Sequence, residues 1–290
     1  MNGVNGPGLR GRPKTQSMDK PINNLILDMD GVLWRGDTPL PGLVDFFATL
    51  RAAGIGFILA TNNATKTAAM YTARLAGFGV AVPPAQILTS AEATAGYLAE
   101  RFTTDQPVYV VGAQGLREAI AAQGFRFLTP AEVRAGSAAA CVVVGLSPQL
   151  TYEELAMASI LVHNGTPFIG TNPDPTFPSE IGPVPGAGAI QAVIITATGV
   201  QPTLIGKPGP IIFREAVKRL GGDPAGVVMV GDRLSTDIAG AQAAGLRSIL
   251  VETGISSRAE AENGPIRPDY IFADITELAA FLTGETALAR

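Results

Sequence analysis

Short apolar runs alternate along the chain with longer segments whose apolar residues recur at the spacing of an α-helix. The strands predicted in the outer parts of the chain are Asn24–Leu27, Gly56–Ala60, Pro202–Gly206, Gly226–Val230, Ser248–Val251 and Tyr270–Phe272. The helices predicted between them are Pro41–Gly54, Thr65–Gly77, Pro210–Leu220 and Ser235–Gly245. This order of strand, turn and helix predicts an α/β fold with a doubly wound parallel sheet.

The middle of the chain has an alternation of its own. Its predicted strands are Pro107–Val111, Cys141–Val144 and Phe168–Ile169, and its predicted helices are Leu116–Gln123 and Tyr152–His163. We therefore predict an inserted α/β module of residues 90–201 within a core formed by residues 21–89 and 202–290. Such a module can close over a ligand and exclude water. Residues 1–20, rich in Gly, Pro and Asn, are predicted to be a disordered tail.

The composition of the chain argues against several classes of protein. Hydrophobic residues make up 47% of the chain and charged residues 16%, which is too apolar for a disordered protein. No apolar run approaches the roughly 18 residues that a membrane-spanning helix needs, so we expect no membrane span. The net charge of −4, without a basic block, argues against nucleic acid as a partner. One cysteine and one histidine leave no disulfide pair and no Cys/His zinc cluster, which fits a cytoplasmic protein.

Polar side chains follow four of the predicted core strands. In chain order they are Asp28 and Asp30, Thr61 and Asn62, Lys207, and Asp232 with Asp237. Because ligands of an open α/β sheet bind beyond the carboxyl ends of its strands, we expect these side chains to surround one site. Several carboxylates in one cleft repel one another unless a cation offsets them, and an all-oxygen set favours Mg²⁺. The pattern therefore predicts a magnesium site.

The same residues suit the transfer of a phosphoryl group. Mg²⁺ commonly shares its coordination with phosphate oxygens, and Lys207 and Thr61 beside it can bind the other phosphoryl oxygens. Asp28, at a strand tip, can attack phosphorus and form an acyl phosphate. Asp30 can protonate the leaving oxygen and then accept a proton from the water that hydrolyses the intermediate. Gly31 permits the sharp turn that this closeness requires.

These segments resemble the motifs of the haloacid dehalogenase (HAD) superfamily of aspartate-nucleophile phosphatases. The matching segments are Asp28–Leu33, Thr61–Asn63, Lys207–Pro208 and Gly231–Asp237. Finer features, in Trp34–Gly36 and Gly170–Asp174, are similar to the NagD-like, p-nitrophenylphosphatase-like branch. The resemblance extends from about Asn24 to Leu282. It implies a HAD-like Rossmannoid core with a large α/β cap between the second and third motifs, and residues 90–201 match that cap.

The resemblance also implies a role for each motif residue. Asp28 would be the nucleophile and Asp30 the general acid and base. Thr61 and Lys207 would bind the phosphoryl group, and Asn62 and Asn63 would add polar contacts.

The metal and cap residues are implied in the same way. The Asp28 and Asp232 carboxylates and the Asp30 backbone carbonyl would hold Mg²⁺, with Asp237 orienting a bound water. Asp174, in the cap loop 171–174, would face the leaving group of the substrate. Members of this branch often form oligomers through the cap, so a homodimer is a further expectation.

Other readings use the same scaffold. A phospho-acceptor receiver domain also pairs an aspartate with Thr and Lys, but Asp30 and the large insert argue against it. Dehalogenation needs no metal, which would leave Asp232 and Asp237 without a purpose. Phosphonate cleavage normally uses a cap lysine, and residues 90–201 contain none.

The substrate itself stays open. A cap of this kind can serve p-nitrophenyl phosphate, phosphoglycolate, pyridoxal phosphate, sugar phosphates or nucleotides. No aromatic or cationic residue stands out near Asp174 as a selector among them.

Overall fold

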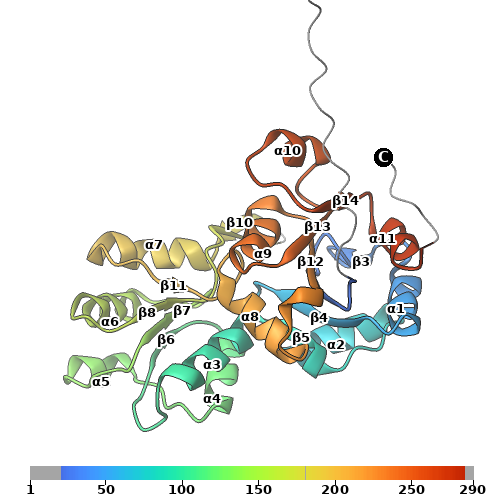
Figure 1. Ribbon diagram of the computed structural model, residues 1–290. Helices are drawn as coiled ribbons and strands as arrows, with labels where there is room; N and C mark the ends of the chain where they lie inside the picture. Colours follow the sequence, from blue (N-terminus) through green and yellow to red (C-terminus); the bar gives the residue numbers. More distant parts are fainter. Residues whose placement is uncertain (1–20, 180, 285–290) are drawn as a thin grey trace, which may run out of the picture.

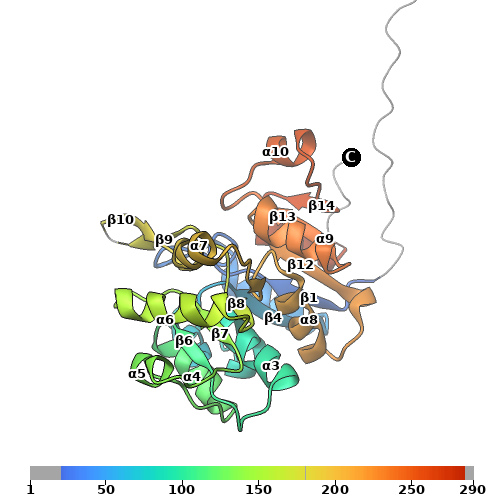
Figure 2. The same cartoon turned by 90° about the vertical axis from the view of Figure 1, so that its left-hand side faces the viewer.

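The computed structural model describes residues 21–179 and 181–284, so the predicted disordered tail of residues 1–20 lies outside the described residues. Two parallel β-sheets with their covering helices lie beside each other (Figure 1), and the view in Figure 2 shows the helices of the smaller sheet next to the larger one. Among the described residues, no helix combines the length and the apolar character that crossing a membrane requires.

The larger sheet has six parallel strands in the order β14-β13-β12-β1-β4-β5. They are β1 (Asn24–Leu27), β4 (Gly56–Thr61), β5 (Ile87–Thr89), β12 (Val227–Gly231), β13 (Arg247–Val251) and β14 (Tyr270–Phe272). β1 is central, with Leu27 opposite Val230 of β12 on one side and Leu59 of β4 on the other. The chain winds outward from β1 in both directions, which makes the carboxyl end of β1 the switch point of the sheet. The predicted doubly wound parallel sheet is confirmed.

Successive residues of the central strands bury their side chains on opposite faces of this sheet. Leu25 and Leu27 belong to one apolar cluster, whereas Ile26 belongs to another. The first cluster contains buried residues of α1 (Leu43–Ala52), α2 (Ala68–Gly77) and α11 (Ile275–Leu282). The second contains those of α3 (Ser90–Arg101), α8 (Pro210–Arg219) and α9 (Ala239–Ala243). Helices therefore cover both faces, which explains why the strands are continuously apolar.

The smaller sheet, called here the cap sheet, has four parallel strands in the order β11-β8-β7-β6. Its strands are β6 (Tyr109–Val111), β7 (Val142–Val144), β8 (Phe168–Gly170) and β11 (Thr203–Leu204). Its connecting segments contain α4 (Gln114–Ala122), α5 (Pro130–Arg134), α6 (Tyr152–His163), the hairpin of β9 (Thr176–Ser179) and β10 (Gly182–Pro185), and α7 (Ala187–Thr198). Val110, Val143 and Ile169 join the apolar cluster that also holds buried residues of α3 and α8. The cap sheet and the core thus share one hydrophobic cluster.

The prediction of a core strand at Pro202–Gly206 is wrong. The strand there is β11, and it pairs with β8 of the cap sheet, Thr203 lying opposite Ile169. A short apolar run predicts a buried strand but not the sheet that it joins, because the neighbouring strand is set by the path of the whole chain. Lys207 consequently enters the site from the edge of the cap sheet.

Helix α2 begins at Ala68, later than the predicted start at Thr65. Thr67 is the residue before the helix, and its hydroxyl accepts a hydrogen bond from the backbone N–H of Met70. Asn63 caps an earlier turn, since its side-chain oxygen accepts from the backbone N–H of Thr65 at 2.8 Å. The segment after β4 is therefore a loop, and it is free to line the site.

Candidate active site

The first acidic turn follows the central strand. The backbone N–H of Asp28 donates to the carbonyl of Val230 at 2.9 Å, so Asp28 stands directly at the tip of β1. Gly31 has φ of 87°, a conformation that favours glycine and lets the chain turn sharply. Asp28 and Asp30 consequently line the same cavity.

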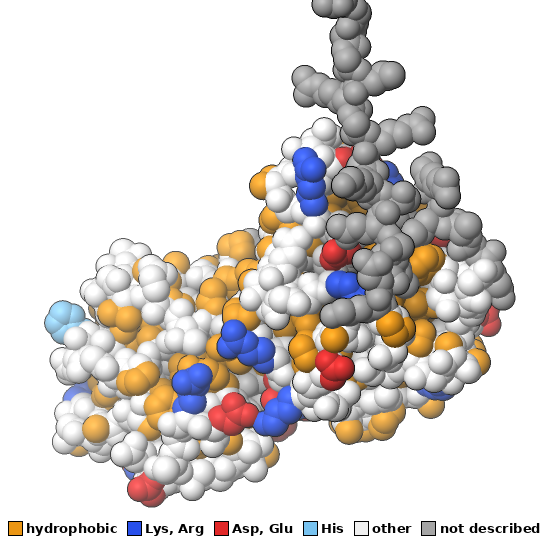
Figure 3. Space-filling view, viewed as in Figure 1, with side chains coloured by type: hydrophobic (Ala, Val, Ile, Leu, Met, Phe, Trp, Pro, Cys, Tyr) orange, Lys and Arg blue, Asp and Glu red, His pale blue; other side chains and the backbone are white. Residues whose placement is uncertain are grey.

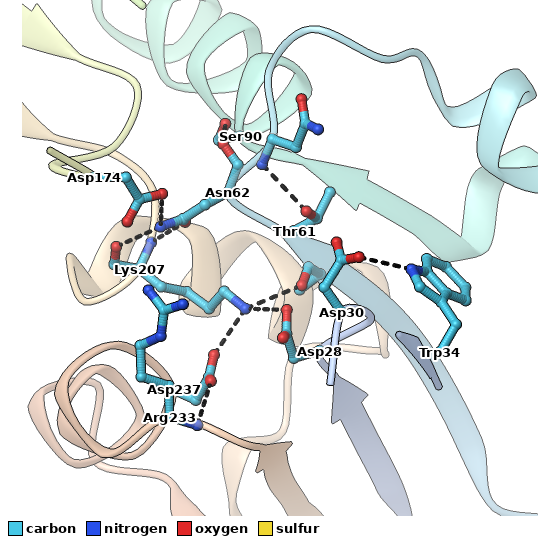
Figure 4. A network of polar contacts seen from close by, with 12 residues as sticks. Asp28, Asp30, Trp34, Thr61, Asn62, Ser90, Asp174, Lys207, Arg233 and Asp237 are labelled. Atoms are coloured by element: carbon cyan, nitrogen blue, oxygen red, sulfur yellow. Dashed lines mark hydrogen bonds and ion pairs between the residues drawn. The ribbon is translucent and has the colours of Figure 1, made fainter. Parts of the chain in front are cut away.

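Lys207 lies between two carboxylates (Figure 4). Its Nζ is 2.5 Å from Oδ1 of Asp28 and 2.7 Å from Oδ1 of Asp237, and it also donates to the carbonyl of Ala60 at 3.2 Å. The side chain is 4% exposed. Burial opposes its charged form, but Asp237 and Asp28 raise the pKa of Lys207 above its ordinary value. Lys207 is therefore a fixed ammonium group at the carboxyl ends of β1 and β4.

Asn62 holds the loop that carries this lysine. Its Oδ1 accepts from the backbone N–H of Lys207 at 2.7 Å, and its Nδ2 donates to the carbonyl of Lys207 at 2.8 Å. Both polar atoms of the amide are thus engaged by protein groups. These two hydrogen bonds fix the backbone of Lys207, so Asn62 positions Lys207 in the cavity.

Asp28, Asp232 and Asp237 form a compact carboxylate cluster. One oxygen of each lies within 4.8 Å of the others. Burial, followed by the charges of Asp237 and Asp232, holds the pKa of Asp28 well above its usual range, although Lys207 opposes this shift. Burial also raises the pKa of Asp232, and Asp237 adds to the effect. One ammonium group does not offset three crowded carboxylates.

The cluster fits a divalent cation. Oδ1 of Asp237 is buried, and the ammonium group of Lys207, at 2.7 Å, is the one described cation that contacts it. Buried acceptors are normally hydrogen-bonded, so this oxygen is suited to a further cationic partner. The donors are all carboxylate oxygens, which hard divalent cations prefer. The cluster of Asp28, Asp232 and Asp237 therefore has the chemistry of a site for a divalent cation, and its role as a metal site stays a prediction.

Asp237 reaches the cluster from a π-helical turn. The predicted helix Ser235–Gly245 is divided into a π-helical turn, Leu234–Ile238, and α9. Oδ2 of Asp237 accepts from the backbone N–H of Arg233 at 3.1 Å, which holds the other oxygen toward Lys207. Single π-helical turns often occur at functional sites, because they redirect one side chain without ending the helix.

Two glycines allow the Asp232 carboxylate to occupy its position. Its Oδ2 accepts from the backbone N–H of Ile255 at 2.8 Å. A Cβ atom on Gly254 would lie 1.8 Å from that oxygen, and one on Gly31 would lie 2.4 Å from it. Gly254 is far from the acidic motifs in the sequence, and nothing in its surroundings there indicates this contact.

Gly254→Ala is therefore expected to displace the Asp232 carboxylate and weaken metal binding. Loss of contacts that orient a metal ligand costs about 10- to 100-fold in affinity, so the metal concentration for half-maximal activity should rise by that factor. This concentration is measured by adding metal back to EDTA-treated protein and following the recovery of activity. Gly77→Ala is the control, since a Cβ there would meet no described atom within 4 Å. An unchanged metal requirement in Gly254→Ala would show that Asp232 does not depend on this packing.

Thr61 and Asn63 occupy the loop after β4. Thr61 is buried, and its Oγ1 accepts from the backbone N–H of Asn63 at 3.1 Å. The side-chain oxygen of Asn63 accepts from both the N–H and the hydroxyl of Thr65, at 2.8 and 2.7 Å. The loop is thus held by its own side chains, and Thr61 is left at the wall of the cavity.

Asp174 reaches the cavity from the cap loop that follows β8. Nδ2 of Asn62 donates to Oδ2 of Asp174 at 3.3 Å, and Nδ2 of Asn172 donates to the carbonyl of Asn62 at 2.8 Å. Burial raises the pKa of Asp174, while Asn62 and Arg233 lower it. These contacts join the cap loop to the loop after β4.

All the predicted site residues line one cavity of about 400 Å³. They are Asp28, Asp30, Thr61, Asn62, Asn63, Asp174, Lys207, Asp232 and Asp237. The separated segments therefore meet at the switch point, between the core sheet and the cap loop. Their roles in catalysis stay predictions.

The cavity also contains residues that the sequence did not predict. Arg233 extends toward Asp174 (Figure 4), so the structure brings a cationic residue to Asp174 although none stood out there in the sequence. Tyr71 and Arg74 line the cavity from one face of α2. Two signals could have found them. Arg233 directly follows a motif aspartate, and residues three apart on a helix share a face.

Comparison with known families gives matches in both parts of the core. A family model described as haloacid dehalogenase-like hydrolase matches residues 25–126, and one described as HAD-hydrolase-like matches residues 204–278. The chain is 39% identical over 257 residues to an acid sugar phosphatase of Staphylococcus aureus (strain USA300), which covers 89% of this chain and 96% of that protein.

Solved structures match over the core and the cap together. A 4-nitrophenylphosphatase from Thermotoga maritima has a TM-score of 0.81 and 37% identity, covering 89% of this chain and 96% of that chain. A glycerol phosphate phosphatase from Mycobacterium tuberculosis, in complex with calcium, has a TM-score of 0.80 and 36% identity, covering 88% of this chain and 74% of that chain.

Proposed function

Because this chain belongs to the haloacid dehalogenase-like hydrolase family, in its p-nitrophenylphosphatase-like branch, we propose that it hydrolyses small phosphate monoesters with Mg²⁺ through an aspartyl phosphate on Asp28. One observation carries the proposal. The carboxylates of Asp28, Asp232 and Asp237 converge within 4.8 Å, and the ammonium group of Lys207 contacts two of them. A carboxylate at a strand tip beside a fixed positive charge suits phosphoryl transfer through an acyl phosphate.

The first half-reaction uses Asp28 as nucleophile. A carboxylate oxygen of Asp28 forms a bond to phosphorus while the bond from phosphorus to the leaving oxygen breaks. Asp30 gives its proton to that leaving oxygen, which departs as an alcohol. Lys207 and Thr61 hold the phosphoryl oxygens, and the fixed position of Lys207 means that little reorganisation is needed as charge moves.

The second half-reaction reverses the role of Asp30. As a carboxylate, Asp30 takes a proton from a water molecule, and the water oxygen forms a bond to phosphorus. The bond between phosphorus and Asp28 breaks, which releases inorganic phosphate and restores the Asp28 carboxylate. The net reaction consumes one water and needs no other reactant.

Mg²⁺ is the proposed ion of the divalent-metal site. The carboxylates of Asp28 and Asp232 and the backbone carbonyl of Asp30 would hold it, with Asp237 orienting a bound water. When bound, the ion neutralises charge on the phosphoryl oxygens and the carboxylates. Mg²⁺ suits a site with few carboxylates because it retains waters and shares phosphate oxygens.

Metal removal tests this proposal. We expect EDTA to abolish hydrolysis of p-nitrophenyl phosphate and added Mg²⁺ to restore it. Ca²⁺ should bind the same carboxylates but restore little activity, because its longer and more flexible coordination does not impose the octahedral geometry of Mg²⁺. Activity that persists in EDTA after exhaustive dialysis would overturn the metal proposal.

Small sugar or polyol phosphates are the proposed substrates. The cavity is about 400 Å³ and presents both donors, from Arg233, and acceptors, from Asp174, beyond the carboxylate cluster. Hydroxyl groups pair with donors and acceptors alike. The names of the Staphylococcus aureus and Mycobacterium tuberculosis relatives agree with this class. A panel of phosphate esters ranked by kcat/KM tests it, and a preference for aromatic or nucleotide esters would contradict it.

Two copies of the chain are proposed to associate through the cap, in addition to the proposed binding of a small phosphate ester. Helix α7 carries no charged residue, and Val193 on α7 and Ile160 on α6 are exposed. The space-filling view shows no acidic or basic side chain over α7 (Figure 3). The mass in solution, by light scattering, distinguishes a dimer from a monomer.

A further inference from the structure

The proposed general acid has a hydrogen-bond donor within its own turn. The indole Nε1–H of Trp34 donates to Oδ1 of Asp30 at 2.8 Å (Figure 4). The backbone N–H of Gly31 donates to the carbonyl of Trp34 at 2.8 Å and closes the turn between them. Asp30 is an exposed residue, and among the described residues no other side chain donates a hydrogen bond to its carboxylate. The indole is thus the group that restricts this carboxylate.

Helix α2 holds the indole ring in place. Trp34 is fully buried, and the ring of Tyr71 stacks on it with centroids 6.3 Å apart and an interplanar angle of 17°. The guanidinium carbon of Arg74 lies 4.7 Å from the centroid of the indole ring, and the ring of Phe78 lies 6.0 Å away. A ring packed on several sides has one orientation, so its N–H is a fixed donor.

The chemistry of indole decides which oxygen of Asp30 can carry a proton. Indole nitrogen is a donor only, so it cannot accept a proton or a hydrogen bond from the carboxyl group. A protonated carboxyl oxygen is a weaker acceptor than a carbonyl oxygen, so the hydrogen bond from the indole N–H favours Oδ1 as the unprotonated oxygen. The transferable proton belongs on Oδ2, and Asp30 lines the cavity.

We propose that Trp34 is a positioning residue for proton transfer, whose indole N–H holds Oδ1 of Asp30 so that Oδ2 meets the leaving oxygen. The inference rests on the proposed role of Asp30 as general acid. If Trp34 has this role, loss of its N–H should slow the reaction most for esters whose leaving group departs poorly without a proton. A p-nitrophenolate leaves readily as an anion, whereas the alkoxide of benzyl phosphate does not.

The experiment exploits the fact that Trp34 is the single tryptophan of the chain. Expression in a tryptophan auxotroph supplied with 3-benzothienylalanine replaces the indole N–H by sulfur at this position alone and keeps the ring shape. The kcat/KM values are measured for p-nitrophenyl, phenyl and benzyl phosphate, because this parameter reports leaving-group departure and excludes hydrolysis of the aspartyl phosphate. Trp34→Phe is a second variant, and Asp30→Asn is measured on the same series.

We expect kcat/KM of both Trp34 variants to fall by less than about threefold with p-nitrophenyl phosphate and by about 10- to 100-fold with benzyl phosphate. The larger loss is a part of the rate acceleration of about 10²- to 10⁴-fold that a positioned general acid contributes. Phe78→Leu is the packing control, because it loosens contact with the same ring and keeps the N–H. That control should lower kcat/KM equally across the series or leave it unchanged.

Two results would overturn the inference in different ways. If the Trp34 variants lose activity equally on all three esters while Asp30→Asn loses most on benzyl phosphate, the indole has only a packing role and the proposed function stands. If Asp30→Asn itself shows no dependence on the leaving group, the acid role of Asp30 fails, and the positioning role of Trp34 fails with it.

Discussion

Asp28→Asn is expected to lower kcat for p-nitrophenyl phosphate by about 10⁴-fold or more, as removal of a covalent nucleophile does in other hydrolases. The amide cannot form the acyl phosphate, because its nitrogen and neutral oxygen are poor nucleophiles toward phosphorus. The substitution keeps the volume of the side chain. In the unsubstituted chain Nζ of Lys207 lies 2.5 Å from Oδ1 of Asp28, and the amide oxygen of Asn can still accept a hydrogen bond from it. The fold should therefore survive.

Steady-state turnover at saturating Mg²⁺ measures this loss, so that weaker metal binding is not mistaken for loss of the nucleophile. Trapping of a phosphorylated chain by acid quench should succeed with the unsubstituted protein and fail with Asp28→Asn. Asp45→Asn, on the exposed face of α1, is the matched control and should change neither result. Turnover by Asp28→Asn within tenfold of the unsubstituted chain would refute the nucleophile assignment.

Lys207→Met is expected to affect both stability and activity. The ammonium group is buried between Asp28 and Asp237, and its removal leaves the three crowded carboxylates without the cation that contacts two of them. Breaking a buried ion pair by deleting one partner costs about 3–5 kcal/mol of the free energy of unfolding. Loss of a fixed cation from the phosphoryl site should also lower kcat by about 10²–10³-fold, even when metal is saturating.

Urea unfolding in EDTA and in Mg²⁺ separates the two effects. The loss of stability should be full in EDTA and smaller in Mg²⁺, because an ion bound only to the folded chain stabilises it and replaces part of the missing charge. Lys218→Met is the matched control: Lys218 is 67% exposed and pairs with Glu100 at the surface, so its removal should change stability by at most about 0.5 kcal/mol. Equal stability of Lys207→Met and the unsubstituted chain in EDTA would contradict the electrostatic argument.

Most of the core fold could be predicted from the order of apolar runs. Each central strand is short and continuously apolar, and this pattern is typical of a parallel sheet with helices on both faces. Since parallel strands end at the same edge of such a sheet, the sequence alone assigns Asp28, Thr61 and Asp232 to one site.

The sequence prediction failed where a local pattern allows more than one partner. The run at Pro202–Gly206 reads equally well as a strand of either sheet, and only the path of the chain brings it beside β8. The helical spacing of Ser235–Gly245 does not distinguish a π-helical turn from an α-helical one. Arg233 was overlooked because its proximity to Asp174 depends on how the cap loop lies on the core.

The sequence by itself determined which chemical groups the protein has and at which strand ends they stand, because backbone periodicity and turn residues are local properties. Only the tertiary structure decided what each group contacts: Asn62 bonds to the backbone of Lys207, Gly254 packs against Asp232, and Trp34 donates to Asp30. The physical reason is that hydrogen bonds and close contacts depend on distances of a few ångströms between segments. Those distances are set by the packing of the whole chain, so the residues around a single sequence position do not determine them.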